Sequence, residues 1–272
     1  MSLGIVIKGT EGVVLAADSR VTLTTIETPV AGKEIHRNVN FDNATKMLIF
    51  REPNEFVGAV TFGDAVIGTT ASDLRTIASY LPEFEVTLAG GSRLSIKEFS
   101  EKLSEFFLTQ WNAKMAAAPV STGIMFVVAG YDEGAAYGSE FSFNIPNTPA
   151  PVEVSANDFG VSWGGQGEIC DRIVNGFDGR LKAGLIKALG VPITKMPALD
   201  AELAKGNLGI PYQFLPLQDC IDLAVFLIRT TSMAQNLSVG LRGVGGEVDV
   251  TVITPEGRKI IKQKGLSGDR IY

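Results

Sequence analysis

Few side chains in this sequence can perform nucleophilic, acid–base or metal chemistry in the usual ways. The sequence holds one histidine, His36, and two cysteines, Cys170 and Cys220, with no further Cys or His at metal-ligand spacing. His36 stands in the polar stretch GKEIHRNVNFDN, which is typical of a solvated loop, and we interpret both cysteines as buried thiols. Histidine-based triads and histidine-rich metal sites are therefore disfavoured.

The glycine-rich turns do not predict a nucleotide site either. None of the 30 glycines is followed by Lys-Ser or Lys-Thr in the way that a P-loop requires. The turn at Gly165 and Gly167 continues to Cys170, where a dinucleotide fingerprint places Gly or Ala, and no strand–helix–strand unit surrounds it. We interpret these glycines as positions of tight turns and close backbone packing.

One acidic and one basic residue stand out by their positions. Asp18 ends the apolar run in EGVVLAADSRVT, and Lys46 lies in the segment NATKM. From spacing alone, an Asp at the end of a buried strand fits a plain strand terminus as well as a charged group held in a site. The elements around these residues must decide between the two.

Composition sets the class of protein. The chain has 272 residues, 45% of them hydrophobic and 20% charged, which is enough to fill a sizeable core. With 24 basic against 30 acidic residues, the sequence offers no positive stripe for nucleic acid. Its longest predominantly apolar stretches, 123–130 and 221–228, are far shorter than the roughly 20 residues of a membrane-spanning helix. The start of the chain lacks the pattern of a signal peptide, so we expect a cytoplasmic protein without a membrane segment.

Hydrophobic periodicity predicts the order of the elements. Strands are expected at 3–8, 13–18, 45–50, 56–62, 123–131, 136–143, 247–254 and 258–262. Asp64 is expected to cap a helix that ends before Pro82, and Ser95 with Glu98 forms a capping box for the next helix. Two further helices are expected, a short one after the turn at 164–167 and a longer one over 217–235. Residues 23–43 form a polar insertion, and the Pro-rich stretch NIPNTPAP is expected to be a surface loop.

The expected strands and helices occur in groups of the same kind and do not alternate one by one along the chain. This order favours an α+β architecture over the parallel sheet of alternating strands and helices. The prediction is a four-layer αββα sandwich, in which two antiparallel sheets are flanked by helices on both outer faces. We expect residues 1–272 to form a single domain that contains the insertion at about 23–43.

These segments resemble the proteasome β-subunit family, and most of all its bacterial Anbu branch of peptidases. In that family a Thr exposed as the first residue lies sixteen positions before the Asp of a strand similar to EGVVLAADSR. The same count back from Asp18 reaches Ser2, which removal of Met1 would expose. The likeness extends in order along most of the chain, through NATKMLIF, VGAVTFGDA, GGQGEICDRIV, MAQNLSVG and VDVTVIT.

The resemblance implies an N-terminal-nucleophile hydrolase with a defined set of site residues. Ser2 would be the nucleophile, with its own free amine as the base, so that no histidine, metal or cofactor is needed. Lys46 would favour the alkoxide, Asp18 would hold the ammonium, and the backbone N–H of Gly63 would stabilise the oxyanion.

Two further residues follow from the resemblance alone. Asn236 falls where many members of the family place an Asp that supports the N-terminus, and Ser238 lies near a supporting Ser. Ser2 in place of Thr and Asn236 in place of Asp depart from the family pattern. A second register, which aligns Gly4 with an early strand glycine of the family, would leave no residue at the nucleophile position.

The resemblance therefore predicts a peptidase that acts on peptides or polypeptides within a homo-oligomeric ring. Whether an ATP-driven unfoldase feeds this ring stays open. Two alternatives remain: a non-catalytic structural subunit of a proteasome-type assembly, and an amidohydrolase of the same superfamily that acts on a small amide.

Overall fold

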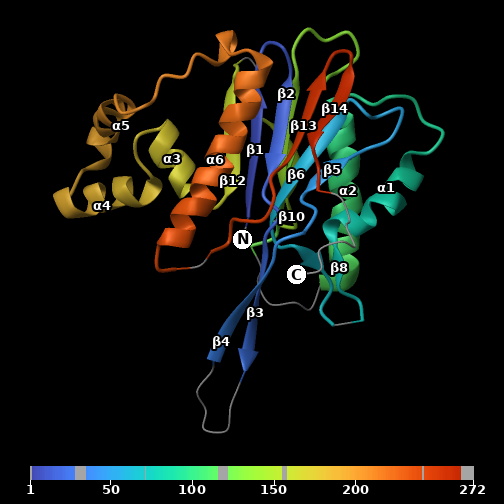
Figure 1. Cartoon of the computed structure of the whole chain (residues 1–272), viewed down its shortest axis with the longest axis horizontal. Coiled ribbons are helices and arrows are strands. Elements are labelled where there is room, and N and C mark those ends of the chain that lie inside the picture. The colour runs from blue at the N-terminus through green and yellow to red at the C-terminus, as the bar shows by residue number, and fades with distance from the viewer. Residues whose placement is uncertain are drawn as a thin grey trace, which may run out of the picture.

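Two five-stranded antiparallel sheets form the centre of the computed structural model, which describes residues 2–27, 35–70, 72–115, 122–154, 158–240 and 242–264 (Figure 1). Across the first sheet the strands are β12 (Gly160–Gly165), β1 (Leu3–Lys8), β2 (Val13–Ala17), β13 (Asp249–Thr254) and β14 (Gly257–Lys262). Across the second they are β11 (Thr148–Glu153), β10 (Ser139–Ile145), β9 (Ile124–Gly130), β6 (Val57–Gly63) and β5 (Met47–Ile49).

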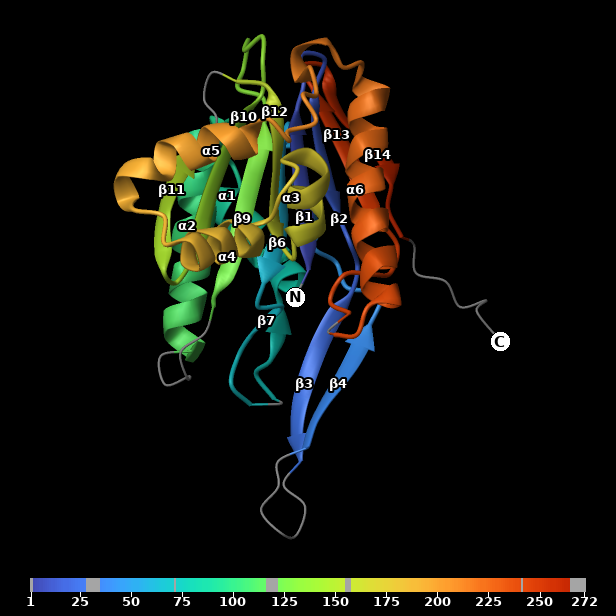
Figure 2. The same ribbon diagram turned by 90° about the vertical axis from the view of Figure 1, so that its left-hand side faces the viewer.

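Helices cover both outer faces of the paired sheets, and the four layers are seen edge-on in Figure 2. The second sheet carries α1 (Leu81–Leu88) and α2 (Ile96–Met115), whereas the first carries α3 (Glu168–Val174) and α6 (Leu217–Leu237). Between α3 and α6 the chain forms α4 (Gly179–Leu189) and α5 (Met196–Ala204). This arrangement confirms the predicted αββα sandwich.

Sequence pattern explains why the central strands pair where they do. Every residue of β1 and β2 is buried, because one face of their sheet packs on α6 and the other on the second sheet. The strands at 3–8, 45–50, 56–62 and 123–131 were predicted within a few residues of their observed bounds.

At the start of α2, Ser95 accepts a hydrogen bond from the backbone N–H of Glu98, whose carboxylate in turn accepts the Ser95 N–H at 3.1 Å. The predicted capping box is therefore confirmed.

The prediction of a helix after Asp64 is wrong. Residues of this segment form the short strands β7 (Val66–Ile67) and β8 (Arg75–Thr76), followed by a 3-10 turn at Ile77–Tyr80. Gly68, the bend at 69–70 and the turn at 72–73 interrupt the helical spacing. Pro82 occupies the first turn of α1, where its missing N–H has no partner to lose. The residue that was expected to stop a helix thus begins one.

Two other segments differ from the sequence-based expectation. The Pro-rich stretch expected as a loop comprises the end of β10, a turn and the first residues of β11. β11 is an edge strand, where proline is tolerated because one side of the strand lacks a ladder partner. In the insertion at 23–43, residues 23–27 and 35–41 belong to a two-stranded ribbon, β3 (Val21–Glu27) and β4 (Ile35–Phe41), that extends away from the sandwich (Figure 1). Residues 28–34 lie outside the described residues. His36 belongs to β4 and not to a loop; its side chain lies outside the described residues.

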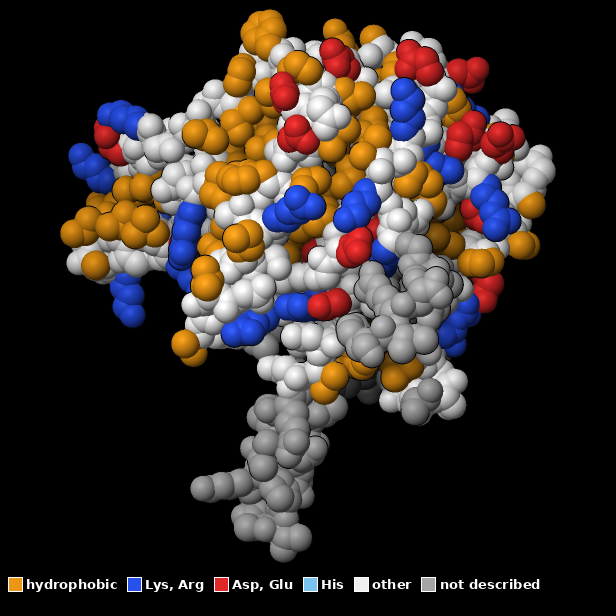
Figure 3. Space-filling model, in the orientation of Figure 1, with side chains coloured by type: hydrophobic (Ala, Val, Ile, Leu, Met, Phe, Trp, Pro, Cys, Tyr) orange, Lys and Arg blue, Asp and Glu red, His pale blue; other side chains and the backbone are white. Residues whose placement is uncertain are grey.

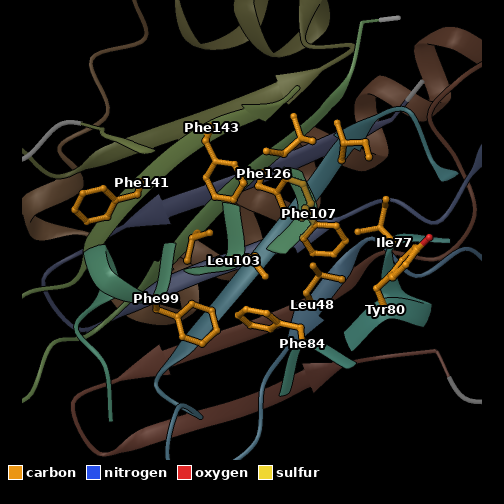
Figure 4. Packing of buried hydrophobic residues seen from close by; sticks show 14 of the residues in the cluster. Leu48, Ile77, Tyr80, Phe84, Phe99, Leu103, Phe107, Phe126, Phe141 and Phe143 are labelled. Atoms are coloured by element: carbon orange, nitrogen blue, oxygen red, sulfur yellow. The ribbon is translucent and has the colours of Figure 1, made fainter. Parts of the chain in front are cut away.

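Aromatic rings fill the core between the second sheet and its helices (Figure 4). Phe107 of α2 lies between Tyr80 and Phe126, with ring centroids 6.0 Å and 4.7 Å away, and Phe126 stacks on Phe143. Such contacts contribute beyond the area they bury. The packing fixes the position of β6, whose last residue, Gly63, lines the cavity of the candidate site.

One carboxylate lies between the two sheets. Glu140 of β10 is 4% exposed and accepts a hydrogen bond from Ser162 of β12, so it connects the second sheet to the first. Burial raises the pKa of Glu140 to about 7, although the bond from Ser162 and the charge of Lys8 oppose the shift.

On the face shown in Figure 3, acidic and basic side chains are interspersed, and hydrophobic side chains gather over α6. Phe226, Met233 and Leu237 are 49%, 64% and 88% exposed, and their spacing places them on one side of this helix. No helix in the described part of the chain combines the length and hydrophobicity needed to cross a bilayer.

We predict that Phe107→Ala lowers the free energy of unfolding by about 3–5 kcal/mol, because it empties a site that the surrounding rings cannot refill. Chemical denaturation measures the change. Val86→Ala on α1 is the control, because Val86 is 74% exposed and should be close to neutral. Equal effects of the two substitutions would contradict the described packing.

We also predict that Glu140→Gln becomes more stabilising relative to wild type as the pH rises. The folded-state pKa of Glu140 lies above the value of about 4.5 in the unfolded chain, so the wild type loses stability between about pH 4.5 and 7, where the carboxyl ionises in the unfolded chain but stays protonated in the folded protein. The difference should grow by roughly 1–3 kcal/mol between pH 5 and 8 in thermal or chemical unfolding. A difference that stays constant with pH would show that Glu140 does not titrate in this way.

Candidate active site

The carboxylate of Asp18 is completely buried at the end of β2 and is surrounded by donors. Its Oδ1 accepts the Leu3 N–H at 2.9 Å and the Lys46 ammonium at 2.6 Å. Its Oδ2 accepts the N–H groups of Arg20 at 3.1 Å and Gly245 at 3.0 Å. Spacing alone left Asp18 as either a plain strand terminus or a charged group held in a site, and these contacts support the charged group.

Lys46 is the cation that faces this carboxylate. Its side chain is 6% exposed, and burial lowers the pKa of Lys46 while the charge and hydrogen bond of Asp18 act to raise it. The carbonyl of Lys46 also accepts the N–H of Thr61 in β6 at 2.9 Å, which anchors the lysine to the second sheet. The Asp18–Lys46 pair thus joins the two sheets at their common end.

Ser2 lies directly before β1 and is 4% exposed. Its carbonyl accepts the Gln166 N–H at 2.8 Å, next to Gly165, which has a positive φ of 93°. A Cβ at Gly165 would lie 1.9 Å from the Ser2 carbonyl oxygen. Only glycine therefore allows this close approach, which holds Ser2 in place. Met1 lies outside the described residues.

A cavity of about 660 Å³ brings three of the expected residues together, because Ser2, Lys46 and Gly63 all line it. Gly63 ends β6 with a φ of 95°, and a Cβ there would lie 2.3 Å from the carbonyl oxygen of Gly123. The rest of the lining is largely apolar and includes Val21, Leu23, Phe41, Phe62, Ala65, Val66, Ile77 and Ala78. Ser2, a buried lysine and a glycine corner thus line one space that is large enough for a side chain or a small ligand.

Asn236 and Ser238 are not brought into this group. Both are exposed at the carboxyl end of α6, and neither lines the cavity. The Ser238 hydroxyl donates to the carbonyl of Gln235 at 3.2 Å, a local bond within the helix end.

Gln235, the neighbour of Asn236, makes the contacts that sequence reasoning missed. Its side-chain amide donates to Gln166 Oε1 at 2.9 Å, and its Oε1 accepts the Val244 N–H at 2.9 Å. Gln166 holds the Ser2 carbonyl, and Gly245, directly after Val244, donates to Asp18. Gln235 therefore connects the two backbone segments that hold Ser2 and Asp18. The sequence did offer a sign of this role, because Gln235 is a polar residue one position before Asn236, on the inward side of the last turn of α6.

The two cysteines are buried thiols, as predicted. Burial raises the pKa of both Cys170 and Cys220 to about 11, with the Thr231 hydroxyl opposing the shift at Cys170. At neutral pH both thiols are protonated, so neither is an activated nucleophile.

The paired sheets with helices on both outer faces form the fold of N-terminal-nucleophile hydrolases. The structure is similar to that of a mutant of Anbu from Hyphomicrobium sp. strain MC1, with a TM-score of 0.52 and 13% sequence identity over 100% of this chain and 90% of that chain. At this identity the likeness concerns the fold alone. No protein-family model matches the sequence, and no curated protein is similar to it.

We predict that Gly165→Ala destabilises the protein by about 1–3 kcal/mol, because a positive φ strains any residue with a Cβ and the added atom collides with Ser2. Gly160→Ala at the start of the same strand is the matched control, because nothing lies within 4 Å of its added Cβ. Urea denaturation of both variants tests the close contact. Two equally stable variants would show that the approach of β12 to Ser2 is looser than described.

Proposed function

We propose that this protein is a peptidase in which Ser2, made the first residue by removal of Met1, is the nucleophile. The observation that carries the proposal is the common cavity of Ser2, Lys46 and Gly63, with Asp18 holding the ammonium of Lys46 at 2.6 Å. Buried ionisable groups whose pKa is shifted, such as Lys46, cluster at functional sites when they line a cleft.

The chemistry follows from the residues present. The free amine of Ser2 takes the proton of its own hydroxyl, directly or through a water, and the oxygen attacks a peptide carbonyl. The ammonium of Lys46 favours the alkoxide, and the N–H of Gly63 stabilises the developing oxyanion. The amine then gives its proton to the leaving nitrogen, and an ester of Ser2 remains. Water activated by the same amine hydrolyses this ester and restores the enzyme.

Peptides or polypeptides are the proposed substrates, and a homo-oligomeric ring in the cytoplasm is the proposed state. The fold shared with Anbu and the apolar stripe of Phe226, Met233 and Leu237 on α6 support association between copies. The chemistry requires no cofactor, since the amine supplies the base.

A structural subunit is the second candidate, and one observation favours it. Asn236 and Ser238, which the family resemblance assigned to support of the N-terminus, are exposed outside the cavity. A small-amide hydrolase is the third, and it would be favoured by a monomeric active protein. Sedimentation of the active species separates this third candidate from the ring.

We predict that a peptide epoxyketone forms one covalent adduct on Ser2, because this reagent requires a hydroxyl and an adjacent free amine. Intact mass spectrometry should show loss of Met1 and a single added inhibitor, mapped to Ser2 by digestion. Ser2→Ala should take up no inhibitor, whereas Ser72→Ala, at an exposed serine outside the cavity, should be labelled like the wild type.

Retention of Met1, or a free Ser2 that stays unlabelled in the folded protein, would contradict the peptidase. Either result would favour the structural subunit.

A further inference from the structure

A second buried acid–base pair lies beside the first. Asp249 of β13 is 1% exposed and pairs in register with Ala17, the residue before Asp18. Its carboxylate accepts both the backbone N–H of Lys264, at 2.9 Å, and the Lys264 ammonium. The Lys264 side chain is only 10% exposed. Burial of two charges is costly unless they are paired and bonded in this way, so the segment after β14 is held by a specific contact.

Lys264 also binds Ser19, the residue that follows Asp18. Its ammonium donates to Ser19 Oγ at 2.9 Å, and this hydroxyl in turn donates to the carbonyl of Glu247 at 2.7 Å. Ser19 is fully buried. The cation therefore fixes the rotamer of a serine in the turn that carries the buried carboxylate.

The backbone of Ser19 connects two of the segments that supply donors to the Asp18 carboxylate. Its N–H donates to the carbonyl of Gly245, and its carbonyl accepts the N–H of Ala44, each at 2.9 Å. Gly245 is itself a donor to Asp18, and Ala44 lies two residues before Lys46. A shift of Ser19 would therefore move both the acid and the cation of the candidate site.

We propose that Lys264 is a positioning residue of the candidate active site, which bridges Ser19 and Asp249 and keeps a second cation beside Lys46. This inference rests on the proposed function only for its effect on catalysis. The contacts of Lys264 with Asp249 and Ser19 exist whether or not Ser2 reacts.

The charges that act on Lys46 give the inference a measurable consequence. Burial is the largest influence and lowers the pKa of Lys46, Asp18 opposes it, and Lys264 and Arg20 lower the pKa further. Among the described residues, Asp42, which binds Arg20, is also close enough for its charge to interact with that of Lys46, and Asp64 lines the same cavity as Lys46. Removal of the Lys264 charge should therefore raise the pKa of Lys46.

The test compares Lys264→Met with Lys262→Met. Lys262 is a matched control, because it lies two residues earlier and pairs with Glu247 at 3.1 Å on the surface, with 49% of its side chain exposed. Titration of Lys46 by NMR of carbon-13-labelled lysine, assigned with Lys46→Arg, reads the local charge without any need for activity. In Lys264→Met the pKa of Lys46 should rise by roughly half a unit or more, and in Lys262→Met it should not change.

Peptide hydrolysis gives the second readout. Lys264→Met should lower kcat on the order of tenfold with a smaller change in KM, because the substrate cavity remains while the reacting groups shift. The alkaline limb of the pH profile should move upward with the pKa of Lys46. If Lys264→Met does not fold, Lys264→Gln removes the charge and keeps a hydrogen-bond donor, with the same expected shift.

An unchanged Lys46 titration in a folded Lys264→Met or Lys264→Gln protein would overturn the inference. So would an equal shift in Lys262→Met. A wild type that hydrolyses nothing and takes up no epoxyketone would refute the proposed function, while the titration would still decide the role of Lys264.

Discussion

The structure of the candidate site depends on keeping one negative charge, that of Asp18, away from water. A buried carboxylate is tolerated only when donors replace its hydration, and the chain supplies three backbone N–H groups and the ammonium of Lys46. These donors come from β1, from the turn after β2, from the loop before β13 and from the segment before β5. Each of these segments is held in place by the same charge, so the end of the sandwich is organised around it.

Much of the fold could be predicted from the sequence because its central strands are fully buried and read as continuous apolar runs. The capping box of Ser95 and Glu98 likewise depends only on local spacing and was predicted correctly. In the site, Ser2, Lys46 and Gly63 meet in one cavity because the two sheets bring their strand ends together. That meeting was inferred from family resemblance and not from periodicity.

The incorrect sequence-based predictions share a cause, because tertiary contacts and not local sequence pattern determine the structure at these positions. The helix predicted after Asp64 had the right apolar spacing, yet the chain turns at 72–73 and pairs two short strands instead. Asn236 was placed by resemblance, whereas Gln235 faces inward, because the last turn of α6 sets which side chain reaches Gln166 and Val244. The contact of Lys264 joins segments far apart in the sequence, so no local pattern could reveal it.

The central claim is that the amine of Ser2 acts as the base for its own hydroxyl. The most direct measurement compares hydrolysis of an internally quenched peptide by two forms of the protein, one released by a protease so that Ser2 is the first residue, the other retaining one residue before Ser2. The account predicts hydrolysis by the first form alone, since an amide nitrogen in the second cannot accept the proton. Equal activity of the two folded forms would contradict it.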